Sequence, residues 1–268
     1  MADVAIAEGT DVSGALLGLV RETTLAGHVW LDNDGRTEMV GGAQVTLYCG
    51  GTVLAEIETQ EDGLYTFDGL MPGQYSIRVV LPAGLLALEP NDRRLAQGDM
   101  ISILESLEVS GGHSGVIELR MAEHQLQLDI GSVKTGRLGD LCWLDVNANG
   151  LQDEGELGIP GVTIELMRDG SCIATTVSDQ YGYYVFERLY PGEYTLRVTA
   201  PAQVRPTQLR TDLPLIVSVL NENGETGLLP VVSGGANYAA DLGFVLINEK
   251  ELPAGYGEGA AQDWTKLR

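Results

Sequence analysis

The chain has 268 residues, of which 38 are acidic and 16 basic, and its formal net charge is −22. This charge excludes nucleic acid and anionic membrane surfaces as partners, and it favours a surface that attracts divalent cations. The 35 glycines and 10 prolines separate short alternating apolar runs. No long run with a helical period competes with them, so the composition predicts an all-β protein built of β-sandwiches.

The first 22 residues contain no recognisable targeting segment. Met1–Glu8 lacks the basic start and apolar core of a signal peptide, and Ala15–Val20 is too short to span a membrane. Within this region Gly18 precedes Trp30 by twelve residues, as Gly131 precedes Trp143. We therefore expect residues 1–22 to hold the last strand of a preceding unit that is absent from the chain, followed by a linker.

The rest of the chain repeats itself. Gly42–Arg78 aligns without a gap to Gly161–Arg197 at an offset of 119 residues, whereas Trp30 aligns to Trp143 at an offset of 113. We expect a first β-sandwich at residues 23–133, a second at 134–248 and a flexible tail at 249–268. The best helical candidate is Arg94–Leu107, for which we predict one or two turns at most.

The twelve residues Asp145–Glu156 have the spacing of the calcium loop of an EF-hand. Gly150 stands where the backbone must turn sharply, and the residues after the loop favour a strand instead of a helix. The competing interpretation is a solvated acidic turn. The predicted ligands of a structural Ca²⁺ ion are the side chains at loop positions 1, 3, 5, 9 and 12 and the carbonyl at position 7: Asp145, Asn147, Asn149, Asp153, Glu156 and Leu151.

The first copy is six residues shorter in this region, and what remains there, Asp32–Glu38, lacks the later ligands. We interpret it as an ordinary turn. The linker between the copies comprises only residues 134–138 and is closely followed by the predicted calcium loop. We therefore expect the ion to lie near the junction and to restrain the angle between the two units.

Cysteines and histidines offer no catalytic arrangement. Cys49, Cys142 and Cys172 have no cysteine partners in the repeat, so we expect lone thiols. Only three histidines occur, and the chain contains no zinc-protease, nucleophile-elbow or phosphate-loop motif. We expect no enzymatic activity.

The second copy also carries Ile159-Pro160-Gly161 directly after the loop, Gly182-x-Tyr184-x-Phe186, and Pro191-Gly192-x-Tyr194. With these motifs, residues 136–247 resemble the B repeat of the Sdr-type surface adhesins, which is related to the collagen-adhesin (Cna) B-type, prealbumin-like domains. The first copy matches in its second half and departs in the calcium loop. The resemblance implies two tandem Cna B-type β-sandwiches, extracellular on a bacterial cell surface, in a calcium-stiffened stalk of neighbouring repeat domains.

Some relatives of this fold form an intramolecular Lys–Asn isopeptide bond with the help of a Glu. Here the place of that Glu is taken by Val79 and Val198, and Lys134 has no partner evident from the sequence. We predict that neither unit is crosslinked.

Two classes of function remain open. The first is a structural stalk or spacer module. The alternative is an adhesin module that recognises a host protein or a glycan through its loops. Leu88–Val116 is the place to look for such a site, because the first unit is seven residues longer than the second in this half.

Overall fold

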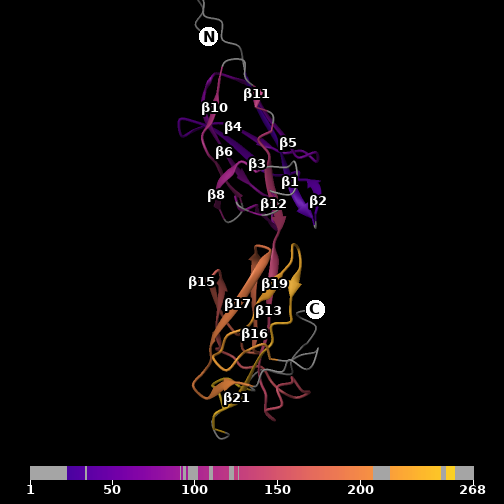
Figure 1. The fold of residues 1–268 in the computed structure, drawn as a ribbon, viewed down its shortest axis with the longest axis vertical. Coiled ribbons are helices and arrows are strands. Elements are labelled where there is room, and N and C mark those ends of the chain that lie inside the picture. The colour runs from indigo at the N-terminus through magenta and orange to yellow at the C-terminus, as the bar shows by residue number, and fades with distance from the viewer. Residues whose placement is uncertain are drawn as a thin grey trace, which may run out of the picture.

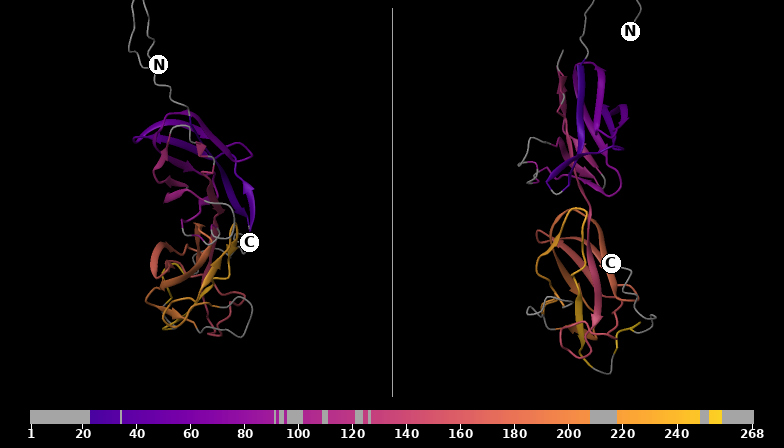
Figure 2. Two further views of the ribbon diagram at one scale, coloured as in Figure 1. Left: turned by 45° about the horizontal axis from the view of Figure 1, so that its top comes forward. Right: turned by 90° about the vertical axis from the view of Figure 1, so that its right-hand side faces the viewer.

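The structure is a computed structural model, and it describes residues 23–33, 35–90, 92, 95, 102–108, 111–120, 124–125, 127–207, 218–248 and 252–256. The described residues form 21 strands and no helix, which confirms the all-β prediction. None of them forms a helix that could cross a membrane. Figure 1 shows two units end to end along the long axis, and the further views in Figure 2 show the same arrangement.

The first unit contains two six-stranded sheets that face each other. In the first sheet the long strand β1 is central and pairs with four of the other strands. Its strands are β1 (Thr23–Asn33), β2 (Arg36–Met39), β5 (Leu64–Leu70), β7 (Leu85–Ala87), β11 (His124–Gln125) and β12 (Ile130–Lys134). The opposing sheet comprises β3 (Gln44–Cys49), β4 (Thr52–Glu58), β6 (Gly73–Val80), β8 (Leu104–Glu108), β9 (Gly111–Ser114) and β10 (Ile117–Leu119).

The second unit repeats this plan with five and four strands. Its first sheet is organised around β13, which follows β12 after a single residue. The strands of that sheet are β13 (Gly136–Leu144), β16 (Tyr183–Leu189), β18 (Val204–Pro206), β20 (Ala236–Asn237) and β21 (Leu242–Leu246). The opposing sheet comprises β14 (Thr163–Arg168), β15 (Ser171–Val177), β17 (Gly192–Thr199) and β19 (Leu229–Val231).

The sequence repeat is also a repeat of strand register. Leu25 pairs with Phe67 in the first unit as Leu138 pairs with Phe186 in the second, at the offsets of 113 and 119 residues. Each unit buries an apolar cluster of its own between its sheets. Alternating inward side chains of half-buried strands supply these cores.

Each unit packs a tryptophan of its first strand against a glycine of its last strand. Trp30 lies opposite Gly131 in the parallel pair β1–β12, and Trp143 lies opposite Gly243 in β13–β21. A Cβ atom at either glycine would come within 2.7 Å of Cζ2 of the tryptophan. The glycine therefore makes room for the indole ring, which gives both tryptophans a structural role in packing.

Three predictions concern the irregular regions of the chain. The helical turns predicted within Arg94–Leu107 are wrong for the end of that stretch, because Leu104 begins strand β8 and pairs with Ser114. The orphan strand predicted within residues 1–22 lies outside the described residues. Of the predicted tail, residues 252–256 are described, and Tyr256 packs against the core of the second unit.

Candidate metal loop and the junction between the units

The loop Asp145–Glu156 begins where β13 ends, and its first carboxylate organises the turn. The buried Asp145 accepts hydrogen bonds from the backbone N–H groups of Asn149 (3.1 Å) and Gly150 (2.8 Å). Gly150 has a φ of 78°, a backbone conformation that residues other than glycine adopt only with strain. The chain thus wraps around the carboxylate of Asp145.

The last predicted ligand closes the loop from the other side. Oε1 of Glu156 accepts the N–H of Val146 at 2.8 Å, and Oε2 accepts that of Asp153 at 3.0 Å. Glu156 is buried, and this burial raises the pKa of its carboxyl, with the charges of Asp145 and Asp153 acting in the same direction. Three carboxylates therefore share one small loop.

The two amides complete the set. Nδ2 of Asn147 and Nδ2 of Asn149 both lie 2.7 Å from the same oxygen, Oδ2 of Asp153. Leu151 donates its N–H to Oδ1 of Asn149 at 2.7 Å. The structure therefore brings the five predicted ligand side chains together within one loop.

The donor set fits a hard cation that prefers oxygen ligands. Within the described ranges, no three His, Cys, Asp or Glu side chains are close enough to hold a metal ion. Carboxylates alone would thus not suffice in this geometry, and the amide oxygens of Asn147 and Asn149 would have to contribute.

The position of the loop corrects one expectation. β13 carries the chain through nine residues away from the linker before the loop begins, which corresponds to about 30 Å at the rise of a strand. The loop start is bound to the last strand, because Asp145 donates its N–H to the carbonyl of Phe244. The predicted ion site therefore lies at the far end of the second unit and not at the junction.

The first-unit counterpart of the loop is the one that lies at the junction. β1 and β2 form a hairpin there, and Gly35 donates its N–H to Oδ1 of Asp32 at 2.9 Å. Asn33 at the end of β1 accepts a hydrogen bond from Nζ of Lys134 at 3.1 Å and donates one to Glu38 at 2.7 Å. The sequence had left Lys134 without a partner, and the structure supplies Asn33.

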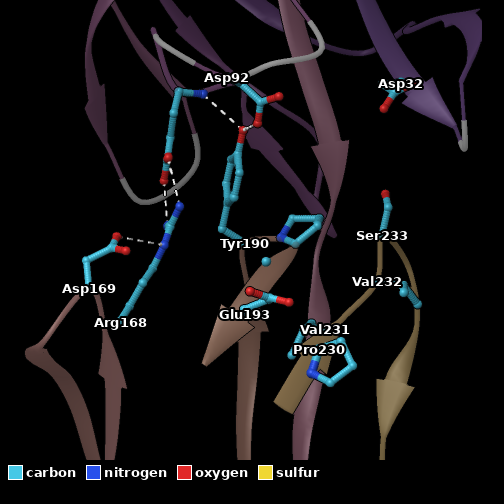
Figure 3. A pocket seen from close by; sticks show the side chains of 13 residues that line it. Asp32, Asp92, Arg168, Asp169, Tyr190, Glu193, Pro230, Val231, Val232 and Ser233 are labelled. Atoms are coloured by element: carbon cyan, nitrogen blue, oxygen red, sulfur yellow. Dashed lines mark hydrogen bonds and ion pairs between the residues drawn. The ribbon is translucent and has the colours of Figure 1, made fainter. Parts of the chain in front are cut away.

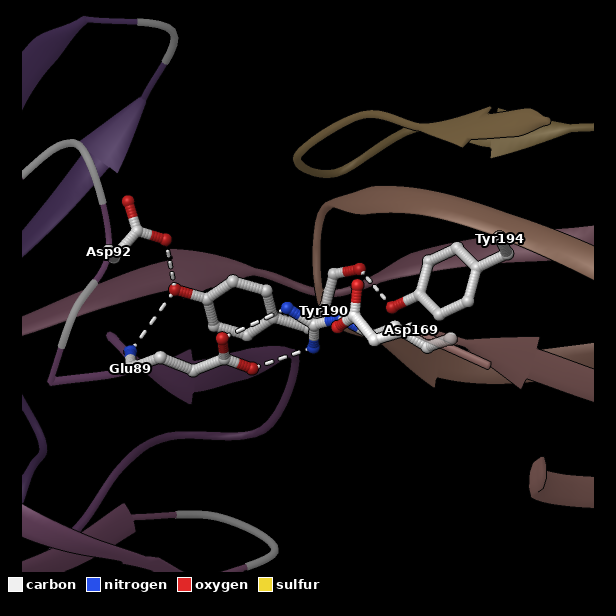
Figure 4. Close-up of polar contacts among 6 residues, drawn as sticks. Glu89, Asp92, Asp169, Tyr190 and Tyr194 are labelled. Carbon is white, nitrogen blue, oxygen red and sulfur yellow. Dashed lines mark hydrogen bonds and ion pairs between the residues drawn. The ribbon is translucent and has the colours of Figure 1, made fainter. Parts of the chain in front are cut away.

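The junction is held by polar contacts between side chains about 80 to 100 residues apart in sequence (Figure 4). Arg168 binds both carboxylate oxygens of Glu89, at 2.7 and 2.9 Å, and its guanidinium lies 5.3 Å from the ring centre of Tyr190. The hydroxyl of Tyr190 donates to Asp92 and accepts the N–H of Glu89. A bidentate Arg–carboxylate pair restricts both distance and orientation.

An apolar contact and a cleft accompany these bonds. The ring of Tyr190 packs in a small buried cluster with Trp30, Leu88 and Val133 of the first unit. Beside it lies a cleft of about 780 Å³ lined by both units (Figure 3), and its acidic rim includes Asp32, Asp92, Asp169 and Glu193. The described residues thus connect the two units through more than the linker.

Sequence reasoning missed the residues of this junction. Glu89, Asp92, Arg168 and Tyr190 belong to no motif. A usable signal was present in the repeat, because Arg168 and Tyr190 align with Cys49 and Met71 and so depart from it. Departures at solvent-facing positions of an otherwise regular repeat can mark contacts that only one copy makes.

The three cysteines are unpaired in the structure. Cys142 is buried, and this burial raises the pKa of its thiol well above the ordinary value. Cys49 and Cys172 are exposed on different units.

The sequence profile of the family described as "SdrD B-like domain" matches the chain twice, at residues 24–131 and 136–244. The chain belongs to this family. The two units, which we now call the first and second B-like domain, are tandem copies of it, as the resemblance predicted.

Similar curated proteins include the serine-aspartate repeat-containing protein F of Staphylococcus epidermidis, with 30% identity over 226 residues, or 81% of this chain and 12% of that protein. The serine-aspartate repeat-containing protein D of Staphylococcus aureus (strain Newman) is 32% identical over 233 residues, or 82% of this chain and 16% of that protein. Colossin-A of Dictyostelium discoideum is 30% identical over 218 residues, or 75% of this chain and 2% of that protein. The chain thus spans a small part of the length of these relatives.

Among solved structures, the minor pilin GBS52 of Streptococcus agalactiae aligns with a TM-score of 0.35 and 12% identity, covering 87% of this chain and 99% of the pilin. The Bacillus anthracis TIE protein aligns with a TM-score of 0.33 and 16% identity, covering 85% of this chain and 34% of that chain.

Proposed function

We propose that this chain is a structural spacer, a piece of a stalk of B-like domains on the outside of a bacterial cell. The observation that carries the proposal is the junction. β12 continues into β13 after one residue, and Arg168 and Tyr190 of the second domain bind Glu89 and Asp92 of the first. A linker this short, reinforced by side-chain bonds on one flank, holds two domains in a fixed orientation, as a spacer requires.

The longer stretch of the first domain, Leu88–Val116, bears on the alternative of a ligand-binding module. Its described residues include Leu88, Glu89 and Asp92, which contact the second domain. These contacts support a role of the stretch between domains. The extracellular location follows, in this proposal, from the resemblance to Sdr-type surface adhesins, and the spacer has no catalytic activity.

Small-angle X-ray scattering tests the spacer. Two linked domains of about 110 residues, each with a radius of gyration of about 13 Å, should scatter as an elongated particle with a narrow distribution of long distances. A globular particle, or a broad distribution typical of freely moving domains, would reject the proposal. Glycan arrays and pull-downs with host proteins examine the alternative directly.

We further propose that Ca²⁺ stabilises the second domain through the loop Asp145–Glu156. The support is the gathering of Asp145, Asp153 and the buried Glu156 with two amides, in a donor set suited to a hard cation. A bound calcium ion would supply the positive charge that offsets the repulsion among these carboxylates. At a concentration of about 100 times its Kd, such a ligand adds about 2.7 kcal/mol to the stability of the folded domain.

Calorimetry of the full chain with calcium and with chelator tests this second proposal. The transition of the second domain should rise in temperature with calcium, and Glu156→Gln should abolish the rise. Glu154→Gln is the matched control, because Glu154 is an exposed acidic residue of the same loop outside the predicted ligand set. Equal melting curves with calcium and with chelator would refute calcium stabilisation.

A further inference from the structure

The internal repeat gives the two domains equivalent ends. Among the residues that the structure describes, a neighbouring domain covers this end in the second domain only. The end of the second domain that faces the first is formed by Arg168, Ile173, Tyr190 and Tyr194. At the offset of 119 residues, their counterparts in the first domain are, in the same order, Cys49, Leu54, Met71 and Tyr75. We call this second set and its surroundings the free face.

Each of these two sets of residues lines a cavity. The two cavities differ in whether the neighbouring domain contributes to the lining. The cavity of the second domain, about 340 Å³, is completed by residues of the first domain, namely Leu86, Ala87, Glu89, Leu107 and Glu108. The cavity of the free face, about 620 Å³, is lined by first-domain residues alone. The free face is therefore the same surface without the domain end that covers it at the junction.

Exposure shows the consequence of this difference. Tyr190 is 9% exposed at the junction, whereas its counterpart Met71 is 56% exposed. Leu54 on the same face is 53% exposed, and Val53 beside it is 49% exposed. A cluster of large apolar side chains on the surface is typical of a docking site.

We propose that the free face docks the C-terminal end of a further B-like domain that stands before the first domain in the same polypeptide. The position in the chain follows from the strand spacing. Lys134 and Thr135 carry the chain from β12 to the start of β13 at Gly136, and Gly131 precedes Trp143 by twelve residues. Gly18 precedes Trp30 by the same twelve residues.

The chemistry of the free face specifies the partner. At the observed junction the second domain presents a cation and a phenol, Arg168 and Tyr190, to the carboxylates Glu89 and Asp92. The free face presents Cys49 and Met71, which can pair with neither carboxylate. A docked end that carried acidic residues there would leave them unpaired and desolvated, which is unfavourable. The partner end should be apolar at these two positions, so the two faces would distinguish their neighbours.

Cys49 offers a direct readout, because it is an exposed thiol on the free face, and Cys172 is an exposed thiol elsewhere on the chain. The test compares alkylation of Cys49 by N-ethylmaleimide in this chain and in an extended chain. The extension is a copy of residues 23–129 inserted before Leu17, with Cys49→Ser, Glu89→Leu and Asp92→Leu in the copy. Cys172 in the same molecules measures the intrinsic rate of the reagent.

Docking should slow the alkylation of Cys49 by about tenfold, equivalent to about 1.4 kcal/mol, with the rate at Cys172 unchanged. Met71→Glu in the original first domain should restore the rate, and Met71→Leu should preserve the protection. Restoring Glu89 in the copy should weaken the protection. An equal rate of Cys49 alkylation in the two chains would overturn the proposal, and so would protection that grows with the concentration of the unextended chain, because that means association between separate copies.

The inference rests on the proposed spacer function, but the two can fail separately. A protected Cys49 in an extended chain that scatters as a compact particle would reject the spacer and keep the docking face. An accessible Cys49 in an elongated particle would reject the docking face and keep the spacer.

Discussion

Asp241 is a buried carboxyl at the start of the last strand, next to the carboxylate of Asp140. Burial, with Asp140 as the second cause, raises the pKa of Asp241 from the ordinary 3.8 to about 8. Between these values the folded domain keeps a proton that the unfolded chain has released. The stability associated with this proton is complete below about pH 4 and is lost as the pH rises through about 8.

The variant Asp241→Asn should therefore be less sensitive to pH than the natural chain. The unfolding free energy of the second domain should fall less steeply between about pH 4 and 8, because asparagine stays neutral throughout. Calorimetry in the presence of chelator measures this slope, and the transition of the first domain in the same molecule is the reference. An identical slope in the variant and the natural chain would contradict the prediction.

Lys134 and Asn33 are neighbours in the structure. They are therefore the pair of side chains between which an isopeptide bond could be sought. We expect no bond between them. A lysine amine becomes a nucleophile where water is excluded, whereas Asn33 and Lys134 are half-buried and Glu38 is exposed. The intact mass should equal the mass of the sequence, both in the natural chain and, with the substituted residue counted, in Lys134→Arg. Loss of one ammonia, mapped to peptides joining Asn33 and Lys134, would prove the expectation wrong.

At the scale of the elements, the junction joins the end of β14 and the turn between β16 and β17 to the chain after β7. The Arg168 and Glu89 side chains are 26% and 37% exposed, so solvent weakens their attraction. A pair of this kind contributes about 1 kcal/mol or less. Its main effect should be on the orientation of the domains.

We therefore expect Arg168→Gln to leave both melting transitions within a few degrees of their natural values and to broaden the distribution of distances between spin labels on the two domains. Arg197→Gln is the control, because Arg197 pairs with Glu165 within the second domain and should not affect the junction. An unchanged distribution in Arg168→Gln would mean that the linker and the apolar cluster around Tyr190 hold the domains without this ion pair.

At the scale of the whole molecule, calcium and shape should be independent in this chain. The candidate loop lies at the far end of the second domain, and the contacts at the junction come from other residues. We expect chelator to lower the melting temperature of the second domain and to leave the X-ray scattering profile at room temperature unchanged. A shorter or broader distance distribution after chelation would show that the loop acts on the junction after all.

The sequence by itself determined the features that depend on local spacing. The all-β class and the two copies follow from the alternation of residue types and from the repeated spacing, where backbone geometry leaves few choices. The strand at Leu104–Glu108 was missed because an apolar pattern of that length is ambiguous between helix and strand, and pairing with β9 decides it.

Only the tertiary structure decided where these features lie relative to one another. A strand of nine residues separates the loop from the linker, so closeness in sequence did not become closeness in space. Conversely, Glu89 and Arg168 are 79 residues apart in sequence and form an ion pair in the structure. No pattern within either segment predicts this contact. Contacts between domains depend on how two folded bodies are oriented, and that orientation results from many weak contacts summed over both surfaces.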